Sequence, residues 1–332
     1  MTRAVVNRAL AVGEVRAEDG ADARAFHDGL AGYAPTPVRE IEPGRVWMKD
    51  ESERLGLPAF KVLGASWAVE RALREAAAAG EAVHTLVAAS AGNHGRAVAH
   101  VAASRGLAGR IFLPARSAQG RRAAIASEGA EVVVVDGGYE EAVAASVAAG
   151  AEDGVVEIAD VGASGPARWV VDGYATLFAE LGDGDAYDLM IVPVGVGSLG
   201  AAAARYGAAH GIAVIAAEPA TAACLGASLA AGKPTTIATP GTTMAGLDCA
   251  EVSPYAWPDL RAGIAGVVAV SDAEVHAAMR RLAARGCAIG DSGAAPLAAL
   301  RALRSDATRV LLIATEGVTD PEGYAAVVAP RA

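Results

Sequence analysis

The chain has 332 residues, of which 53% are hydrophobic and 20% charged, and its formal net charge at pH 7 is −10. This length is about twice that of a typical domain, so we expect two domains and a large core. The composition excludes a disordered polyelectrolyte. The acidic balance argues against partners such as nucleic acid or anionic membranes, which need a basic face.

Membrane insertion, secretion and metal binding are also not expected. The longest charge-free apolar stretch covers residues 189–204 and is interrupted by Pro193 and three glycines, and it is shorter than the roughly 18 residues of a membrane span. The N-terminus lacks the apolar core of a secretion signal. The three cysteines are scattered without metal-ligand spacing, so we expect reduced thiols in a cytoplasmic protein; they are Cys224, Cys249 and Cys287.

Runs rich in valine and isoleucine alternate along the chain with alanine-rich stretches, which predicts buried parallel strands between helices. We expect strands over residues 83–90, 110–114, 131–136, 155–160, 189–194, 212–218, 266–270 and 310–315. Helices are expected over residues 64–79, 94–105, 118–128, 139–149, 167–181, 199–210, 222–231, 272–285 and 294–304. This alternation is typical of an α/β fold. Because glycine-rich residues 162–166 divide the strands evenly, we expect two sheets with a ligand site in the cleft between them.

Lysine is rare in this chain, which contains only Lys49, Lys61 and Lys233 against 25 arginines. Lysine differs from arginine because it can lose its proton and form a Schiff base with a carbonyl group. Lys61 follows Phe60 in an apolar segment just before a predicted helix. It is either a desolvated nucleophile or a lysine whose aliphatic stem lies on an apolar surface.

Residues 90–95 read Ser-Ala-Gly-Asn-His-Gly and join a predicted strand to a predicted helix. Small residues let a ligand approach the backbone, and the N–H groups at a helix N-terminus bind anions such as carboxylates. Asn93 can donate or accept a hydrogen bond toward a ring substituent. The alternative is a simple strand-to-helix turn capped by Ser90 or Asn93, with His94 in a structural role.

Residues 195–200 read Gly-Val-Gly-Ser-Leu-Gly between a predicted strand and a helix, which favours a phosphate cradle. The same G-x-G-x-x-G pattern, with Glu218 at the end of the next strand, also fits a dinucleotide-binding domain. An NAD(P)-dependent oxidoreductase is therefore an alternative, and so is a tight turn without a ligand.

The last predicted strand brings Thr315 and Glu316 to its C-terminal end, where α/β proteins bind ligands. Either side chain can hydrogen-bond a heteroaromatic nitrogen. A hydroxyl group would leave a pyridine neutral, whereas a carboxylate would keep it protonated.

In this order, the four segments resemble those of the fold-type II pyridoxal-phosphate enzymes, a tryptophan-synthase-β-like family that includes the threonine and serine dehydratases. The resemblance is strongest to the diaminopropionate ammonia-lyases and is carried by residues 33–37, 49–52, 59–64, 92–96, 195–198, 244–247, 292–294 and 315–320. It implies pyridoxal 5′-phosphate as cofactor, a small amino acid as substrate and a homodimer. It also implies a large, phosphate-binding domain (1–50 with 166–332) and a smaller domain (51–165), each with a mostly parallel twisted sheet flanked by helices.

The resemblance also implies roles for individual residues. Lys61, next to Phe60, would carry the cofactor as a Schiff base and move protons at the substrate Cα. Asn93 would bond the ring hydroxyl, and Thr315 would face the ring nitrogen, with Glu316 as the second candidate for that role. The phosphate would be held by Gly195, Val196, Gly197, Ser198 and Leu199. The substrate carboxylate would bind at Ser90, Ala91, Gly92, Asn93 and His94, and Ser90 and Asp160 would join Lys61 as catalytic residues.

The chain departs from the ammonia-lyases at two places. Ala91 stands where they have a catalytic aspartate, so the turn is closer to the dehydratase version. Asp160 corresponds to a second lyase carboxylate, with a loop or capping role equally open, and residues 161–168 after it differ as well. We therefore expect α,β-elimination from a small L-amino acid, diaminopropionate-like or hydroxylated, to ammonia and a 2-oxo acid. A β-replacement synthase is the alternative.

Overall fold

The computed structural model describes residues 3–17, 20–182, 187–303 and 307–329. Its contacts divide the chain into two compact units, Met1–Phe60 with Tyr174–Ala332 (unit 1) and Lys61–Gly173 (unit 2). The sequence placed the smaller domain at 51–165. The sequence also places the cofactor phosphate in the large domain and the Asn93 loop in the smaller one, and this assignment stays a prediction.

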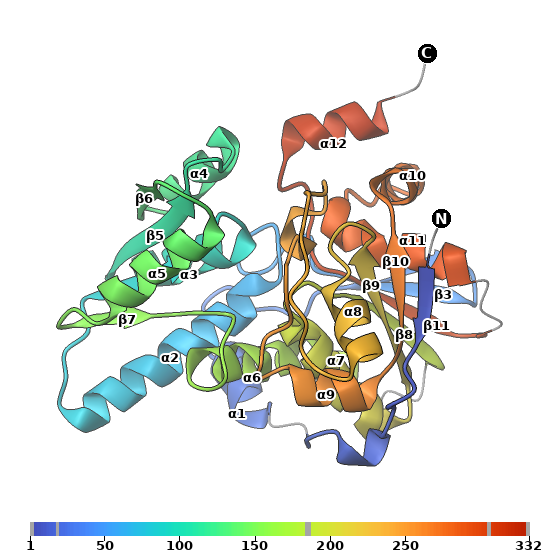
Figure 1. Ribbon diagram of the computed structural model, residues 1–332, viewed down its shortest axis with the longest axis horizontal. Helices are drawn as coiled ribbons and strands as arrows, with labels where there is room; N and C mark the ends of the chain where they lie inside the picture. Colours follow the sequence, from blue (N-terminus) through green and yellow to red (C-terminus); the bar gives the residue numbers. More distant parts are fainter. Residues whose placement is uncertain (1–2, 18–19, 183–186, 304–306, 330–332) are drawn as a thin grey trace. The chain divides into compact units, whose positions relative to one another are not determined.

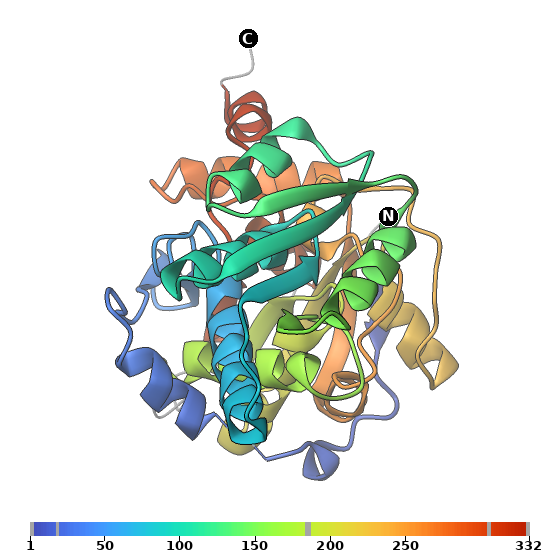
Figure 2. The same cartoon turned by 90° about the vertical axis from the view of Figure 1, so that its left-hand side faces the viewer.

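Unit 2 is built on a parallel sheet with strand order β6-β5-β4-β7 (Figure 2). Helix α5 packs against these strands around a small core that includes Val87, Phe112 and Ala142, while α3 packs on β4 and β5 and α2 packs on α3. The elements of unit 2 are α2 (Lys61–Ala79), β4 (Thr85–Ala89), α3 (Asn93–Ser104), β5 (Ala108–Pro114), α4 (Gln119–Ala126), β6 (Glu131–Val135), α5 (Tyr139–Gly150) and β7 (Val155–Glu157).

Unit 1 contains a larger sheet with strand order β1-β10-β9-β8-β11-β3-β2, in which only the outer pairs β1–β10 and β2–β3 are antiparallel. Helix α11 packs along strands β8 to β11 with α10 against it, and α7 packs on β8 and β9 (Figure 1). The elements are β1 (Arg3–Val6), α1 (Ala21–Asp28), β2 (Val38–Glu42), β3 (Val46–Asp50), β8 (Leu189–Pro193), α7 (Ser198–His210), β9 (Ala213–Pro219), α8 (Cys224–Ala231), α9 (Trp257–Gly263), β10 (Ile264–Val270), α10 (Asp272–Ala283), α11 (Asp291–Leu303), β11 (Val310–Ala314) and α12 (Pro321–Val328). Helix α6 (Pro166–Ala179) belongs to both units.

The α/β fold with mostly parallel, helix-flanked sheets is confirmed, and every predicted strand and helix is found with shifted ends. Residue 304, the end of one predicted helix, lies outside the described residues. The prediction missed β1, β2, β3, α1, α9 and α12. Strands β1 and β2 are edge strands, and β3 ends in Lys49 and Asp50. None of the three has the unbroken apolar run of a strand buried on both faces.

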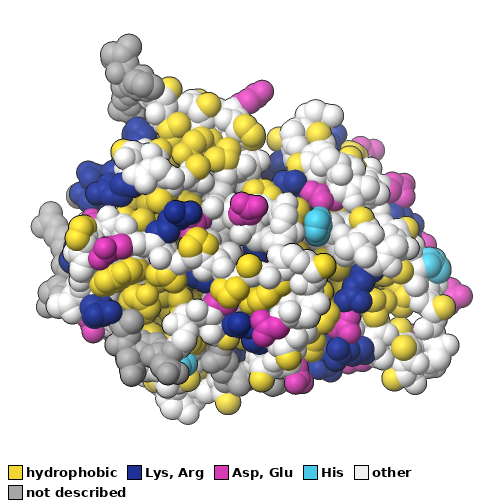
Figure 3. Space-filling view, turned by 180° about the vertical axis from the view of Figure 1, so that it is seen from behind, with side chains coloured by type: hydrophobic (Ala, Val, Ile, Leu, Met, Phe, Trp, Pro, Cys, Tyr) yellow, Lys and Arg dark blue, Asp and Glu magenta, His cyan; other side chains and the backbone are white. Residues whose placement is uncertain are grey.

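The described residues contain no helix that is long and apolar enough to cross a bilayer. On the face shown in Figure 3, side chains of both charge signs are interspersed with hydrophobic ones.

Candidate functional site

The three lysines lie in different environments, and only one of them suits a reactive amine. Lys49 is fully buried and donates to the Thr36 carbonyl and to Glu180. Lys233 is exposed. Lys61 is the first residue of α2, and its side chain keeps 17% of its accessible surface. A lysine that is partly buried and still reachable combines desolvation with access to a carbonyl group.

Within unit 2, Lys61 is paired with Asp160. The Lys61 Nζ donates to Oδ2 of Asp160 at 2.9 Å, and the Asp160 side chain is 14% exposed. Burial by itself would raise the pKa of the Asp160 carboxyl, but the charges facing it and its hydrogen bond from Lys61 hold that pKa below its ordinary range. The structure thus brings together two of the three predicted catalytic residues, which are far apart in the sequence.

His94, predicted as part of the carboxylate-binding turn, directs its side chain into unit 2. It is 3% exposed, its Nε2 lies 2.7 Å from the Ile158 carbonyl oxygen, and its Nδ1 lies 4.0 Å from Oδ2 of Asp160. Desolvation lowers the pKa of this imidazole, and the nearby Lys61 charge lowers it further against the attraction of Asp160. His94 is therefore neutral near pH 7, so it offers the turn its backbone N–H rather than a charge.

The turn between β4 and α3 is held in a narrow backbone geometry. The Ser90 Oγ accepts from the Gly92 N–H at 3.3 Å, and Gly92 precedes the first residue of α3, Asn93. A Cβ atom at Gly95 would lie 2.2 Å from the Ser90 carbonyl oxygen, so only glycine fits there. Ser90, Ala91, Gly92 and Asn93 are all half-buried. The turn leads directly into the N-terminus of α3, and binding of an anion there stays a prediction.

In unit 1, the predicted phosphate cradle lies between β8 and α7. Gly197 precedes α7 with a φ of +96°, and a Cβ there would lie 2.4 Å from Cδ1 of Leu260. A Cβ at Gly195 would lie 2.9 Å from Sγ of Cys249 and 3.0 Å from the Gly246 carbonyl oxygen. Bare backbone at both glycines, followed by the N-terminus of a long helix, fits a phosphate group.

Thr315 and Glu316 follow β11, and both are buried. The Glu316 Oε1 accepts from the Ser292 backbone N–H at 3.0 Å, at the start of α11, so this carboxylate caps a helix. The Thr315 carbonyl accepts from the Phe60 N–H at 3.2 Å, which ties the residue before Lys61 to the end of β11. Thr315 and Glu316 are the two predicted partners of the ring nitrogen. The Thr315 hydroxyl can bond such a nitrogen, whereas Oε1 of Glu316 already accepts a hydrogen bond from the start of α11.

Glu218 is fully buried and accepts from the Leu225 and Gly226 N–H groups at 2.7 and 2.9 Å. Burial raises its pKa to about 7. Both carboxylate oxygens are occupied in capping α8, so this acid is not positioned as a ribose ligand. Of the two observations that favour the dinucleotide-binding alternative, Glu218 thus no longer supports it, and the glycine pattern at residues 195–200 remains.

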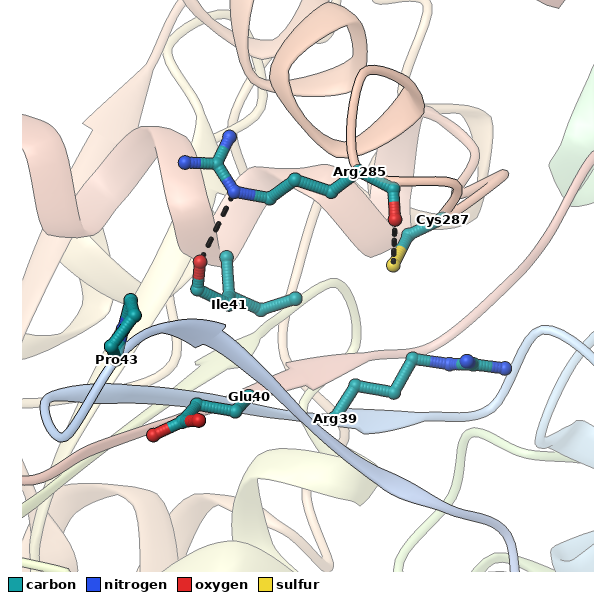
Figure 4. Close-up of a pocket in the computed structure, with 6 residues that line it drawn as sticks. All are labelled: Arg39, Glu40, Ile41, Pro43, Arg285 and Cys287. Atoms are coloured by element: carbon teal, nitrogen blue, oxygen red, sulfur yellow. Dashed lines mark hydrogen bonds between the residues drawn. The ribbon is translucent and has the colours of Figure 1, made fainter.

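Two features of unit 1 were not predicted. A buried ionic network joins Glu180 to Lys49 and to Arg54, which also donates to Glu51. Glu180 is far from the other three members in the sequence, and only the rarity of lysine pointed to the network. A surface hollow of about 500 Å³ is lined by Arg39, Glu40, Ile41, Pro43, Arg285 and Cys287 (Figure 4). None of the predicted site residues lines this hollow.

Comparison with known proteins identifies the family of this chain. Residues 30–316 match the family described as "Pyridoxal-phosphate dependent enzyme". The chain is 31% identical to diaminopropionate ammonia-lyase of Escherichia coli K12, over 92% of this chain and 90% of that protein. It is 32% identical to a biosynthetic L-threonine dehydratase of Corynebacterium glutamicum, over 68% of this chain and 52% of that protein.

A solved structure supports the same relationship. Diaminopropionate ammonia-lyase of E. coli, in complex with an aminoacrylate-PLP azomethine reaction intermediate, matches with a TM-score of 0.89 and 28% identity, over 99% of this chain and 97% of that chain. The resemblance found in the sequence is confirmed. The chain belongs to the pyridoxal-phosphate dependent enzymes of fold type II.

Proposed function

We propose that this protein is a pyridoxal-phosphate-dependent lyase that removes a β-substituent and the amino group from a small L-amino acid, giving ammonia and a 2-oxo acid. The observation that carries the proposal is Lys61, a partly buried amine in an ion pair with Asp160 at the start of α2. The relatives named above, an ammonia-lyase and a dehydratase, support elimination as the reaction.

In this proposal the Lys61 amine would hold the cofactor through its aldehyde, and the same amine, when free and neutral, would remove the proton from the substrate Cα. When bound, the cofactor supplies an electron-withdrawing ring that accepts the electrons left at Cα. Asp160, whose Oδ2 lies 2.9 Å from Nζ of Lys61, exchanges a proton with that amine. The proton thus stays within the site and is available when the β-substituent leaves.

The remaining predicted residues would bind the phosphate and the ring of the cofactor, and the carboxylate of the substrate. Backbone N–H groups of Gly195, Val196, Gly197, Ser198 and Leu199 would bind the phosphate, aided by the positive end of α7. Asn93 would bond the ring hydroxyl, and the Thr315 hydroxyl would face the ring nitrogen and leave it neutral. Glu316 holds the start of α11 instead, which supports Thr315 as the ring partner.

The substrate carboxylate would bind at the start of α3, because the first N–H groups of a helix point toward an anion at its N-terminus. Ala91 has no acid-base group, so one face of the substrate lacks a proton acceptor. We therefore expect L-amino acids to react and D-diaminopropionate to be a poor substrate. We also propose a homodimer and a cytoplasmic location, both of which the resemblance to the family implies.

The test is release of 2-oxo acid and ammonia by the purified, cofactor-loaded protein from a panel of L- and D-diaminopropionate, L-serine and L-threonine. We expect Lys61→Ala to lose activity, whereas Lys233→Ala, which changes an exposed lysine, keeps it. Full activity of Lys61→Ala would contradict the proposal. Added thiols or amines that yield a coupled product would identify a β-replacement synthase instead.

A further inference from the structure

The neighbour of Asp160 that has no role so far is the imidazole of His94. Its Nε2 lies 2.7 Å from the Ile158 carbonyl oxygen, an acceptor only, so Nε2 carries the proton. The neutral ring must then have a lone pair at Nδ1. This Nδ1 is buried and has no hydrogen-bond partner among the described residues. A buried acceptor without a donor is costly unless another state of the site satisfies it.

The position of that lone pair indicates which state satisfies it. Nδ1 lies 4.0 Å from Oδ2 of Asp160, the same oxygen that accepts from Lys61. With Asp160 ionised, Nδ1 and Oδ2 are two acceptors, and they stay apart. With a proton on Oδ2, a movement of about 1 Å would bring them to hydrogen-bond distance.

The charges around Asp160 depend on Lys61. Besides burial, the groups that act on this carboxylate are His94, from α3, the Lys61 ammonium, from α2, and a backbone hydrogen bond. His94 attracts the carboxylate only when its ring is protonated, and desolvation lowers the pKa of that ring. With His94 neutral, Lys61 is the cation among these groups that favours the ionised carboxylate. Once Lys61 loses its charge, burial favours the protonated carboxyl.

We propose that His94 is a positioning residue for Asp160, and that its Nδ1 accepts the hydrogen bond of that carboxyl whenever it holds the proton given up by Lys61. In this step an N–H bond of the Lys61 ammonium breaks, its electron pair stays on Nζ, and an O–H bond forms at Oδ2 of Asp160. The reverse step returns the proton. Asp160, with His94 as its hydrogen-bond acceptor, therefore holds one proton beside the Lys61 amine, which must be neutral to attack a carbonyl. The use of this proton in catalysis rests on the proposed function, whereas the proton exchange between Lys61 and Asp160 does not.

The exchange can be tested without cofactor by ¹⁵N NMR of histidine-labelled protein, since the chain has only six histidines. Lys61→Met removes the charge and keeps the stem. We expect the His94 Nδ1 resonance to move upfield in this variant, as for an acceptor that gains a hydrogen bond, and to return in Lys61→Met/Asp160→Ala. An unchanged Nδ1 resonance in Lys61→Met would overturn the proposal.

A matched pair of variants tests the catalytic use. His94→Asn keeps an acceptor near the place of Nδ1, and His94→Gln keeps a donor toward Ile158. In cofactor-loaded protein we expect His94→Gln to lower kcat about tenfold or more. It should also move the apparent pKa of Asp160 in the pH profile of kcat to lower pH. His94→Asn should have a kcat and a pH profile close to those of the wild type. Equal losses and unmoved pH profiles in the two would refute the catalytic use. A moved NMR signal in protein that binds no cofactor would refute the proposed function and leave the His94–Asp160 pair standing.

Discussion

Replacing Lys61 with methionine should destabilise the cofactor-free protein in a pH-dependent way. The substitution keeps an unbranched apolar stem and leaves the Asp160 carboxylate, 14% exposed, without the ammonium 2.9 Å away. Removing one partner of a buried ion pair costs about 3–5 kcal/mol because the other charge stays buried. At 2.9 Å and an effective dielectric of about 20, the lost attraction is about 6 kcal/mol, which is an upper bound.

Protonation of Asp160 limits this cost. An ordinary aspartate can be protonated at pH 7 for about 4 kcal/mol and at pH 5 for about 1.5 kcal/mol. The charge-related loss in Lys61→Met therefore cannot exceed these values. In the wild-type protein the lowered pKa of Asp160 keeps it ionised at both pH values, so its contribution there is constant and is lost only at lower pH. The destabilisation by Lys61→Met should thus shrink by about 2–3 kcal/mol between pH 7 and pH 5.

The assay is urea unfolding of cofactor-free wild type and Lys61→Met at pH 5, 6 and 7. Asp160→Asn in the Lys61→Met background is the matched control, because it removes the buried charge and should recover most of the loss at pH 7. A destabilisation that is equal at all three pH values, or a double variant no more stable than Lys61→Met, would refute the reasoning.

Three further predictions concern unit 1. Gly197→Ala places a Cβ 2.4 Å from Leu260 at a φ of +96°. The resulting strain of about 1–3 kcal/mol should weaken cofactor binding about tenfold or more, as measured by a titration of absorbance. The control is Gly211→Ala, at a positive φ with open space at the other end of α7, which should lower stability without changing cofactor affinity. Because burial raises the pKa of Glu218 to about 7, the folded state binds a proton that the unfolded state releases, so stability should fall as pH rises from about 4.5 to about 7, by up to about 3 kcal/mol. Glu218→Gln should remove that part of the slope in urea unfolding, and an unchanged slope would count against it. Glu180→Gln leaves Lys49 and Arg54 without their shared carboxylate and should cost about 3 kcal/mol; a loss below about 1 kcal/mol in the same assay would show that the network contributes little.

The parts of the fold that could be predicted are those with a local signal. Strands such as β8 and β11 are continuous apolar runs, and the segments at their C-terminal ends, Gly195–Gly200 and Thr315–Glu316, were found where the chemistry of α/β folds places them. Edge strands β1 and β2 have no such run and were missed.

The site needed long-range contacts that periodicity does not encode. Asp160 is 99 residues from the lysine that it pairs with, and the carbonyl that fixes the tautomer of His94 is 64 residues away. Likewise, the hydrogen bond from the Ser292 N–H to Oε1 of Glu316 spans 24 residues and could not be predicted from the sequence. Residue types and strand ends thus predicted where the chemistry lies, while the protonation states depend on tertiary packing.

The central claim is that pyridoxal phosphate is bound through Lys61, and borohydride reduction followed by peptide mass spectrometry tests it most directly. The chain has only Lys49, Lys61 and Lys233, so the modified lysine can be assigned without ambiguity. We predict a yellow protein that borohydride bleaches, a reduced adduct on the peptide that contains Lys61, and neither in Lys61→Ala. A protein that stays colourless with added pyridoxal phosphate, or an adduct confined to Lys49 or Lys233, would contradict the account.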